Sequence, residues 1–275
     1  MRLAAARPST LSCCYAAVVI LFLVGPILIG VVVAFSSGDR LEFPPPGLSL
    51  RWFREALRTP QFMEGLWNSV IIAAGSAALA TLAGTGAAIA LNHYRFFGRS
   101  AVQAMVMLPI TLPGIVLGLG LLFMLRSYGM KPGLLAATFG HAMLGVPYVT
   151  AMVLAALANY DRSLERASLN LGVGPVRTFF RITLPLIRNG VIAGAVSAFL
   201  ISLDNFSLSL FITKGDTLPL RLMQQLLFYA DPSVAAISTL LLVGSLVLVV
   251  FVLPLVTWAR GRSTDEPAAI RAERR

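Results

Sequence analysis

The sequence predicts an all-α integral membrane protein with about six transmembrane helices, and three observations lead to this prediction. Of the 275 residues, 57% are hydrophobic and only 12% are charged, whereas a soluble domain averages about 25% charged residues. The mean hydropathy of +0.81 describes more apolar surface than one aqueous core can hide. The apolar residues also gather in runs of roughly 20 residues or more, which is the length that a helix needs to cross a bilayer.

Six apolar runs meet this length, and we predict spans near 12–35, 67–91, 102–125, 134–157, 186–212 and 236–258. Arg188 and Asn189 leave the start of the fifth span open. We predict that residues 1–275 form a single transmembrane domain, with an N-terminal segment at 1–11, a membrane bundle at 12–258 and a polar tail at 259–275.

The first apolar run is predicted to be a retained span. It is too long for the hydrophobic core of a signal peptide, and the stretch 34–36 is a poor cleavage site. The adjacent Cys13 and Cys14 cannot join distant segments and are expected to be ordinary buried thiols.

The loop at 36–66 that follows is expected to contain one short helix. Its Pro44-Pro45-Pro46-Gly47 stretch predicts stiff, extended chain. Trp52, Phe53 and Leu57 predict a short amphipathic helix on the membrane surface. We favour an interfacial anchor in which Trp52 sits in the aromatic belt.

The next three spans carry helix-packing and helix-breaking residues. The second span is rich in small residues, which let helix backbones approach closely in lipid. Pro109 and Pro113 in the third span, and Pro147 in the fourth, each remove a helix hydrogen bond. Two interpretations of these prolines remain: they are simple kinks, or they are hinges that let the bundle rock. Transporters place broken helices near their pathways, which is why the second interpretation is kept.

A polar, basic island at 161–185 separates the fourth and fifth spans, and we predict that it forms an elbow of two helices. Asp161 can cap a helix, and Leu164, Ala167 and Leu171 recur on one helical face. Gly172 suits the end of that helix. Pro175 can begin a second short helix that leads through Pro185 into the next span.

The fifth span contains Asp204, the acid that we place inside a membrane segment, followed by Asn205 and Ser207. A carboxylate there costs roughly 2.5–3.5 kcal/mol on insertion scales, so it usually faces a cavity or a partner. We predict that these three residues line a translocation pathway, where the acid would favour a cation. The alternative is that the span ends early and Asp204 caps a following segment.

The elbow resembles the signature loop of permease subunits of binding-protein-dependent ABC importers. The matching residues are Gly172, Pro175, Phe179, Phe180, Ile182, Thr183, Leu184 and Pro185. The signature's Glu-Ala-Ala positions hold Arg166, Ala167 and Ser168 here, with Glu165 one place early. The resemblance implies that the elbow docks on a separate cytoplasmic ATPase subunit. Leu164, Ala167, Leu171 and Gly172 would seat it, while Glu165 and Arg166 would make polar contacts.

The resemblance also implies the rest of the machine. ATP and Mg²⁺ would be bound by the ATPase partner, with no cofactor on this chain. A second permease subunit would complete the pathway, and a periplasmic binding protein would deliver the solute, with the loop at 36–66 as part of its landing surface. The run from Ser202 to Thr213 and the segment 217–236 resemble the spermidine/putrescine branch, which implies a polyamine as the solute. Aminophosphonates, iron complexes and thiamine, which related systems carry, remain open alternatives.

Charge predicts the orientation. With the N- and C-termini in the cytosol of a bacterium, 14 of the 22 basic residues lie on the inner side of the plasma membrane and 8 on the outer side, as the positive-inside rule requires. The net charge of +10 is therefore interpreted as a topology signal with anionic-lipid contact. Nucleic-acid binding is not expected, because no single basic face emerges.

The residues of common catalytic sites do not combine here. The two lysines, Lys131 and Lys214, are followed by Pro132 and Gly215 and cannot complete a phosphate-binding P-loop. His93 and His141 are isolated, so we expect interfacial or hydrogen-bonded roles and no metal site. The main rival is a stand-alone secondary transporter or channel driven by an ion gradient; an integral-membrane enzyme is a second rival.

Overall fold

A computed structural model describes residues 10–158 and 160–257, and in this part of the chain the secondary structure is helical apart from one isolated β-bridge. The predictions for residues 1–9 and for the tail at 259–275 lie outside the described residues. Contacts divide the chain into two compact units. Unit 1 comprises Met1–Pro60 and Leu222–Gly244, and unit 2 comprises Gln61–Arg221 and Ser245–Arg275.

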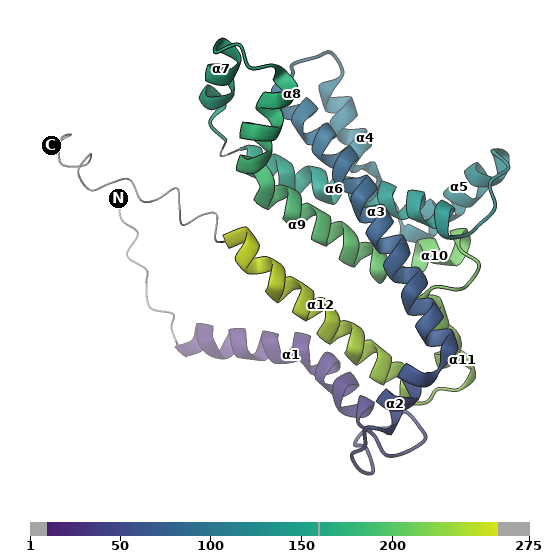
Figure 1. Ribbon diagram of the computed structural model, residues 1–275. Helices are drawn as coiled ribbons and strands as arrows, with labels where there is room; N and C mark the ends of the chain where they lie inside the picture. Colours follow the sequence, from purple (N-terminus) through teal and green to yellow (C-terminus); the bar gives the residue numbers. More distant parts are fainter. Residues whose placement is uncertain (1–9, 159, 258–275) are drawn as a thin grey trace. The chain divides into compact units, whose positions relative to one another are not determined.

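Unit 1 is built from α1 (Thr10–Ala34), α2 (Arg51–Arg58), most of α11 (Leu218–Phe228) and the first half of α12 (Ser233–Thr257) (Figure 1). The short helix predicted from Trp52, Phe53 and Leu57 is α2. Cys13 and Cys14, which we expected to be buried, are exposed on α1, because few residues of this helix's apolar stretch are buried within the chain.

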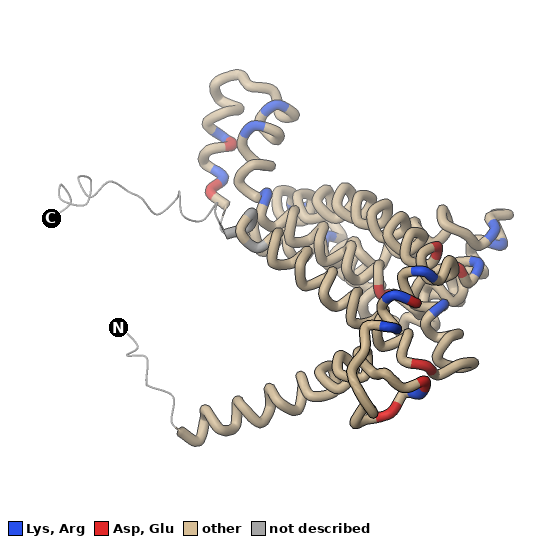
Figure 2. The backbone as a smooth tube through the Cα atoms, turned by 60° about the horizontal axis from the view of Figure 1, so that its bottom comes forward, with Lys and Arg blue, Asp and Glu red and all other residues tan. Residues whose placement is uncertain are grey.

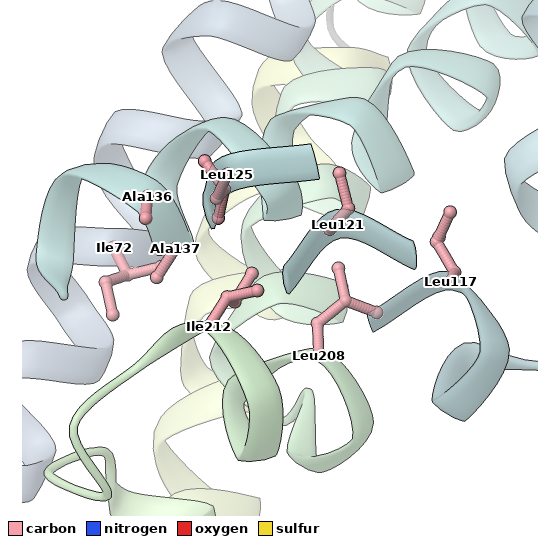
Figure 3. Packing of buried hydrophobic residues seen from close by; sticks show 8 residues of the cluster. All are labelled: Ile72, Leu117, Leu121, Leu125, Ala136, Ala137, Leu208 and Ile212. Atoms are coloured by element: carbon pink, nitrogen blue, oxygen red, sulfur yellow. The ribbon is translucent and has the colours of Figure 1, made fainter. Parts of the chain in front are cut away.

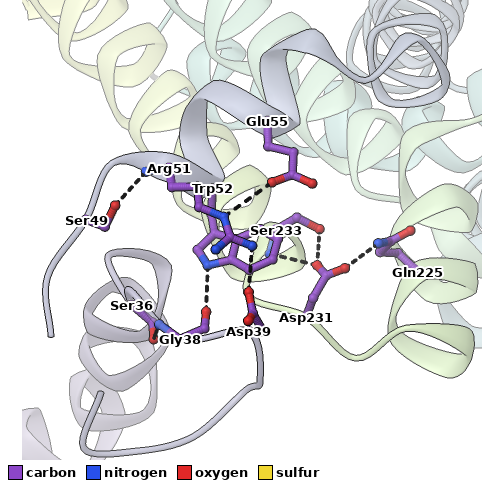
Figure 4. A network of polar contacts seen from close by, with 10 residues as sticks. All are labelled: Ser36, Gly38, Asp39, Ser49, Arg51, Trp52, Glu55, Gln225, Asp231 and Ser233. Carbon is purple, nitrogen blue, oxygen red and sulfur yellow. Dashed lines mark hydrogen bonds and ion pairs between the residues drawn. The ribbon is translucent and has the colours of Figure 1, made fainter. Parts of the chain in front are cut away.

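Trp52 does not lie in an exposed belt, so the predicted interfacial role is wrong for this side chain. It is 4% exposed and packs with Ala34 and Ala236, whose small side chains leave room for the indole. The indole N–H donates to the carbonyl of Gly38 at 3.0 Å (Figure 4). The amphipathic pattern predicted the helix but could not identify the surface that covers it.

Polar contacts fix the loop and the helix starts of unit 1 (Figure 4). Arg51 pairs with Asp39 at 2.6 Å and, more loosely, with Glu55 at 3.8 Å. Asp231 accepts from the Ser233 backbone N–H at 3.0 Å and from its hydroxyl, and so caps α12.

Unit 2 is a helical bundle with α6 (Leu134–Leu157) between α3 (Pro60–His93) and α9 (Leu184–Leu203) (Figure 1). Gly84 of α3 and Gly194 of α9 both approach Val149 of α6 so closely that a Cβ would lie under 3.0 Å from it. The small residues predicted to allow close packing in the second span therefore do so.

Five described helices are long and apolar enough to cross a membrane, or six if one bent pair counts as a single span. That pair is α4 (Arg99–Thr111) and α5 (Gly114–Ser127), bent by 108°. The third span, predicted over 102–125, is therefore broken at Pro113, whereas Pro109 lies inside α4. Leu112 is extended, and Pro113 is the N-cap residue directly before α5. Proline has no N–H and disfavours helical geometry in the residue before it, which explains the break.

The fifth span also differs from the prediction of 186–212. The helical run begins at Pro175 and ends at Leu203, and α10 (Phe206–Ile212) follows as a separate short helix. Polar side chains that can bond to the backbone favour helix ends over interiors, and Asn205 does so here.

A hydrophobic cluster joins α5 and α10 to the bundle (Figure 3). Leu117, Leu121 and Leu125 of α5 meet Leu208 and Ile212 of α10. Further members are Ile72 of α3 and Ala136 and Ala137 of α6. The cluster holds the segment after the Asp204 break against the second arm of the bent pair.

Candidate functional site

The elbow at 161–185 begins with α7 (Arg162–Asn170), as the sequence predicts. Asp161 accepts from the Ser163 backbone N–H at 2.8 Å, which caps the helix and lowers the pKa of the Asp161 carboxyl. Gly172 follows the end of this helix with a φ of +80°, which is costly for other residues. Hydrogen bonds from Gly172 N–H to Leu169 O and from Val173 N–H to Ser168 O close a Schellman motif.

The second half of the elbow is continuous with the fifth span. Pro175 opens α8 (Pro175–Thr178), which passes through the π-helical turn η1 (Phe179–Thr183) into α9. The hydroxyls of Ser168 and Thr178 lie 2.9 Å apart, are buried, and join the two halves. Within unit 2, the elbow projects beyond the ends of the neighbouring bundle helices (Figure 1).

Most of the predicted coupling residues lie on the outside of the elbow. Leu164 is 50% exposed and Leu171 is 84% exposed. Arg166, Ala167, Gly172 and Pro185 are also exposed. Figure 2 shows basic positions along both limbs of the elbow. The result is a projection with apolar side chains among basic ones, which is a typical composition for a protein-binding surface.

Glu165 differs from these residues because its carboxylate points into the protein. Its Oε2 lies 2.9 Å from Nε2 of His93, the last residue of α3, and accepts a hydrogen bond from the Tyr160 hydroxyl at 3.2 Å. The Tyr160 hydroxyl also lies 3.3 Å from Oγ1 of Thr183. His93 has the hydrogen-bonded role that we predicted, but the sequence carried no signal for a partner 72 residues away.

The three predicted pathway residues lie at the break between α9 and α10. Asn205 caps α10 by accepting from the Leu208 backbone N–H at 2.9 Å. Asp204 is exposed, and its carboxylate has no hydrogen-bond or ion-pair partner within the described part of the chain. Ser207 faces α5, since a Cβ on Gly114 would lie 3.0 Å from the Ser207 Cβ. The helix ends early, as the alternative expected, but Asn205 and not Asp204 is the capping residue; the pathway role of these residues stays a prediction.

Close to this break, a buried histidine forms a polar cluster that the sequence did not reveal. His141 of α6 is 3% exposed. It bonds with Ser202 of α9 at 2.8 Å and with Ser209 of α10 at 3.3 Å, and Ser202 also bonds with Ser76 of α3 at 2.9 Å. Isolated serines in apolar segments gave no sign that they would meet.

The predicted hinge prolines have three different settings. Pro113 lies at the 108° bend. Pro109 is buried inside α4, and Pro147 is buried inside α6, which continues through it. Residues 10–158 and 160–257 contain no group of three metal-ligating side chains.

Comparisons with known proteins agree with this arrangement. Residues 80–260 match the family model described as "Binding-protein-dependent transport system inner membrane component". The chain is 32% identical over 230 residues to the putrescine transport system permease protein PotI of Escherichia coli (strain K12), covering 80% of this chain and 82% of that protein. It is 33% identical over 235 residues to the spermidine/putrescine transport system permease protein PotC of Haemophilus influenzae, covering 85% and 91%.

Solved structures share the fold. A chain of a bacterial ABC transporter involved in the import of the acidic polysaccharide alginate superposes with a TM-score of 0.65 at 18% identity, covering 88% of this chain and 92% of that chain. A chain of the MetNI methionine ABC transporter, in inward-facing conformations, gives a TM-score of 0.53 at 20% identity, covering 73% and 93%.

Proposed function

The chain belongs to the family of binding-protein-dependent transport system inner membrane components and is a multi-pass permease subunit of an ABC importer; we propose that its solute is a polyamine. The relatives named as putrescine and spermidine/putrescine permeases cover at least four fifths of this chain. The Asp204 carboxylate at the α9–α10 break, which has no partner among the described residues, supports the same solute class, because a polyamine is a flexible cation.

We propose that the elbow receives an ATPase subunit that binds ATP and Mg²⁺. The observation that carries this proposal is a projecting two-helix elbow with exposed Leu164 and Leu171 on a chain that lacks a P-loop. When a partner covers exposed leucines, the burial of their apolar surface stabilises the complex by about 25 cal/mol per Å². Arg166 and Ala167 would border this contact, Gly172 would set the turn, and Pro185 lies in the first turn of α9 behind it. A direct contact of Glu165 with the ATPase stays a prediction.

We propose that solute passes Asp204, Asn205 and Ser207. A carboxylate at membrane depth is costly unless it faces water or a cation, and a passing ammonium group would offset that cost. The bend at Pro113 lies in the span whose second arm packs on α10. Rocking about Pro113, with smaller adjustments at Pro109 and Pro147, would open the path alternately to the two sides.

The remaining assembly follows from the same premise. A second permease, either a paralogue or another copy of this chain, would complete the pathway. A periplasmic binding protein would select the solute and dock on the outer surface, anionic lipid would surround the bundle, and both termini would face the cytosol. Nucleic acid has no place in this function.

Reconstitution tests the proposed function. The complex is purified through a tag on this chain from its native membrane, placed in liposomes, and supplied with labelled putrescine or spermidine on the binding-protein side. Uptake should require ATP on the elbow side, and Leu171→Asp should remove the ATPase from the complex. Uptake that persists without ATPase or ATP, driven by an imposed ion gradient, would instead identify the rival stand-alone transporter.

A further inference from the structure

Glu165 ties α7 to the end of another helix. Its Oε2 atom lies 2.9 Å from Nε2 of His93, which ends α3. The two side chains are 23% and 9% exposed, so water screens this pair less than a surface ion pair. Nδ1 of His93 is buried without a hydrogen-bond partner among the described residues, and Nε2 is therefore the imidazole atom that anchors this ring.

The direction of each hydrogen bond follows from the carboxylate. An ionised carboxylate only accepts, so both His93 Nε2–H and Tyr160 O–H donate to Glu165. Because the Tyr160 hydroxyl proton is already donated to Glu165, the Thr183 hydroxyl is the donor in its hydrogen bond to the Tyr160 phenol oxygen, at 3.3 Å. Burial raises the pKa of Tyr160 and the Glu165 carboxylate adds to this shift, which keeps the phenol protonated and able to donate.

A second contact strengthens the same junction. Arg162, in the first turn of α7, donates through Nη2 to the backbone carbonyl of His93 at 3.4 Å. Carbonyls at a helix C-terminus have no partner inside the helix, and a cation there is favourable. The Ser168–Thr178 hydrogen bond, in contrast, joins α7 to α8 inside the elbow and does not reach α3.

We propose that Glu165 is a positioning residue inside the chain: it links α7 to α3 through His93 and to α9 through Tyr160 and Thr183, so that a displacement of α7 moves both helices. Thr183 is the last residue of η1, directly before α9, and is 2% exposed. The inference rests on the proposed function, because it assigns the internal path by which movement of the elbow reaches the bundle.

Substitutions at His93 separate this role from a direct contact between Glu165 and the ATPase. His93 belongs to α3, so changing it breaks the link without altering the exposed face of α7. Tyr94 is the matched control, since it is the next residue and 65% exposed. The variants are His93→Ala, Glu165→Ala, the double variant, the exchange His93→Glu with Glu165→His, and Tyr94→Ala.

The experiment uses the whole importer complex and measures two quantities, the ATPase that co-purifies and the polyamine taken up per ATP hydrolysed. Each single alanine variant should retain the ATPase and lower uptake per ATP by about fivefold or more, the scale of a typical coupling between sites. The double variant should be no worse than either single variant, because both break one link. The exchange should recover part of the coupling, and Tyr94→Ala should match the parent.

Two results would overturn the inference while leaving the proposed function intact. One is single variants that couple as well as Tyr94→Ala. The other is Glu165→Ala losing the ATPase while His93→Ala couples normally, which would make Glu165 an intersubunit contact. If the alanine variants do not accumulate in the membrane, the variant Tyr160→Phe provides the test. Reduced uptake per ATP in this variant supports the link. Uptake per ATP equal to that of the parent overturns the proposed connection from Glu165 to α9. A parent complex that contains no ATPase would refute the proposed function itself.

Discussion

The imidazole of His141 bridges the two sides of the α9–α10 break: its Nδ1 lies 2.8 Å from Oγ of Ser202 and its Nε2 lies 3.3 Å from Oγ of Ser209. Ser202 is in the last turn of α9, and Ser209 is in α10. One buried side chain of α6 therefore holds the geometry around the proposed pathway residue Asp204. The ring is 3% exposed, so these contacts lie inside the bundle.

Replacing His141 by alanine should destabilise the bundle. The substitution leaves the hydroxyls of Ser202 and Ser209 without this partner, at a cost of about 1–3 kcal/mol, and adds a cavity. The midpoint of thermal unfolding in detergent should fall by several degrees. Phe139→Ala in the same helix is the control, because Phe139 is 56% exposed; equal midpoints for the two variants would contradict the prediction.

Replacing Gly172 by leucine should weaken coupling to the ATPase but leave membrane insertion unchanged. A Cβ at Gly172 meets nothing within 4 Å, so the penalty comes from the φ of +80°, which costs other residues roughly 1–2 kcal/mol. Gly172→Asn should be milder, because asparagine tolerates this conformation. Polyamine-stimulated ATP hydrolysis measures the effect.

Gly174 is the control for that experiment. It also has no atom within 4 Å of a built Cβ, but its φ is −61°, which suits any residue. Gly174→Leu should therefore behave like the parent. A loss of coupling as large as that of Gly172→Leu would mean that bulk in this turn, rather than backbone conformation, is what matters.

The contact between α3 and α6 predicts different effects for two nearby glycines. A Cβ on Gly84 would lie 2.7 Å from Val149 Cβ and 2.9 Å from Val146 O, whereas one on Gly86 meets nothing within 4 Å. Gly84→Ala should cost about 1–3 kcal/mol, the usual range for overpacking. Gly86→Ala should be neutral or slightly stabilising. Thermal unfolding of the two purified variants compares them directly, and similar midpoints would rule out this close contact.

Replacing Asp204 by asparagine should lower polyamine uptake several-fold without a matching loss of stability. The carboxylate has no partner to lose within the described residues, so neutralising it removes a charge and little packing. Uptake over a range of polyamine concentrations would show the change, with Asp204→Glu as the variant that keeps the charge. Kinetics identical to the parent would reduce Asp204 to a structural role.

Local patterns predicted the elements that depend on neighbouring residues. Asp161, Gly172 and Pro175 marked the elbow because caps, left-handed helix ends and helix starts have strong residue preferences. The lengths of the apolar runs gave the spans to within a few residues in most cases. Pro113 indicated where the third span would break, but a proline in the sequence does not determine the bend angle, which is 108°.

Contacts between distant segments were the part that the sequence could not predict. Glu165 and His93 are 72 residues apart, and Ser76 and Ser202 are 126 residues apart. Such pairs depend on how helices cross, which periodicity does not encode. Glu165 was expected to contact an ATPase because the signature loop that it resembles implies a polar contact there, yet its position on the helix turns its carboxylate toward His93 of α3.

The helical run from Pro175 to Leu203 has no break along its 29 residues, and at 1.5 Å per residue it is about 44 Å long. Its first turns belong to the elbow, and its last turn stands beside Asp204. It can therefore work as a lever, in which a small tilt applied at one membrane face becomes a sideways shift of several ångströms near the other, with no need for the intervening chain to unfold.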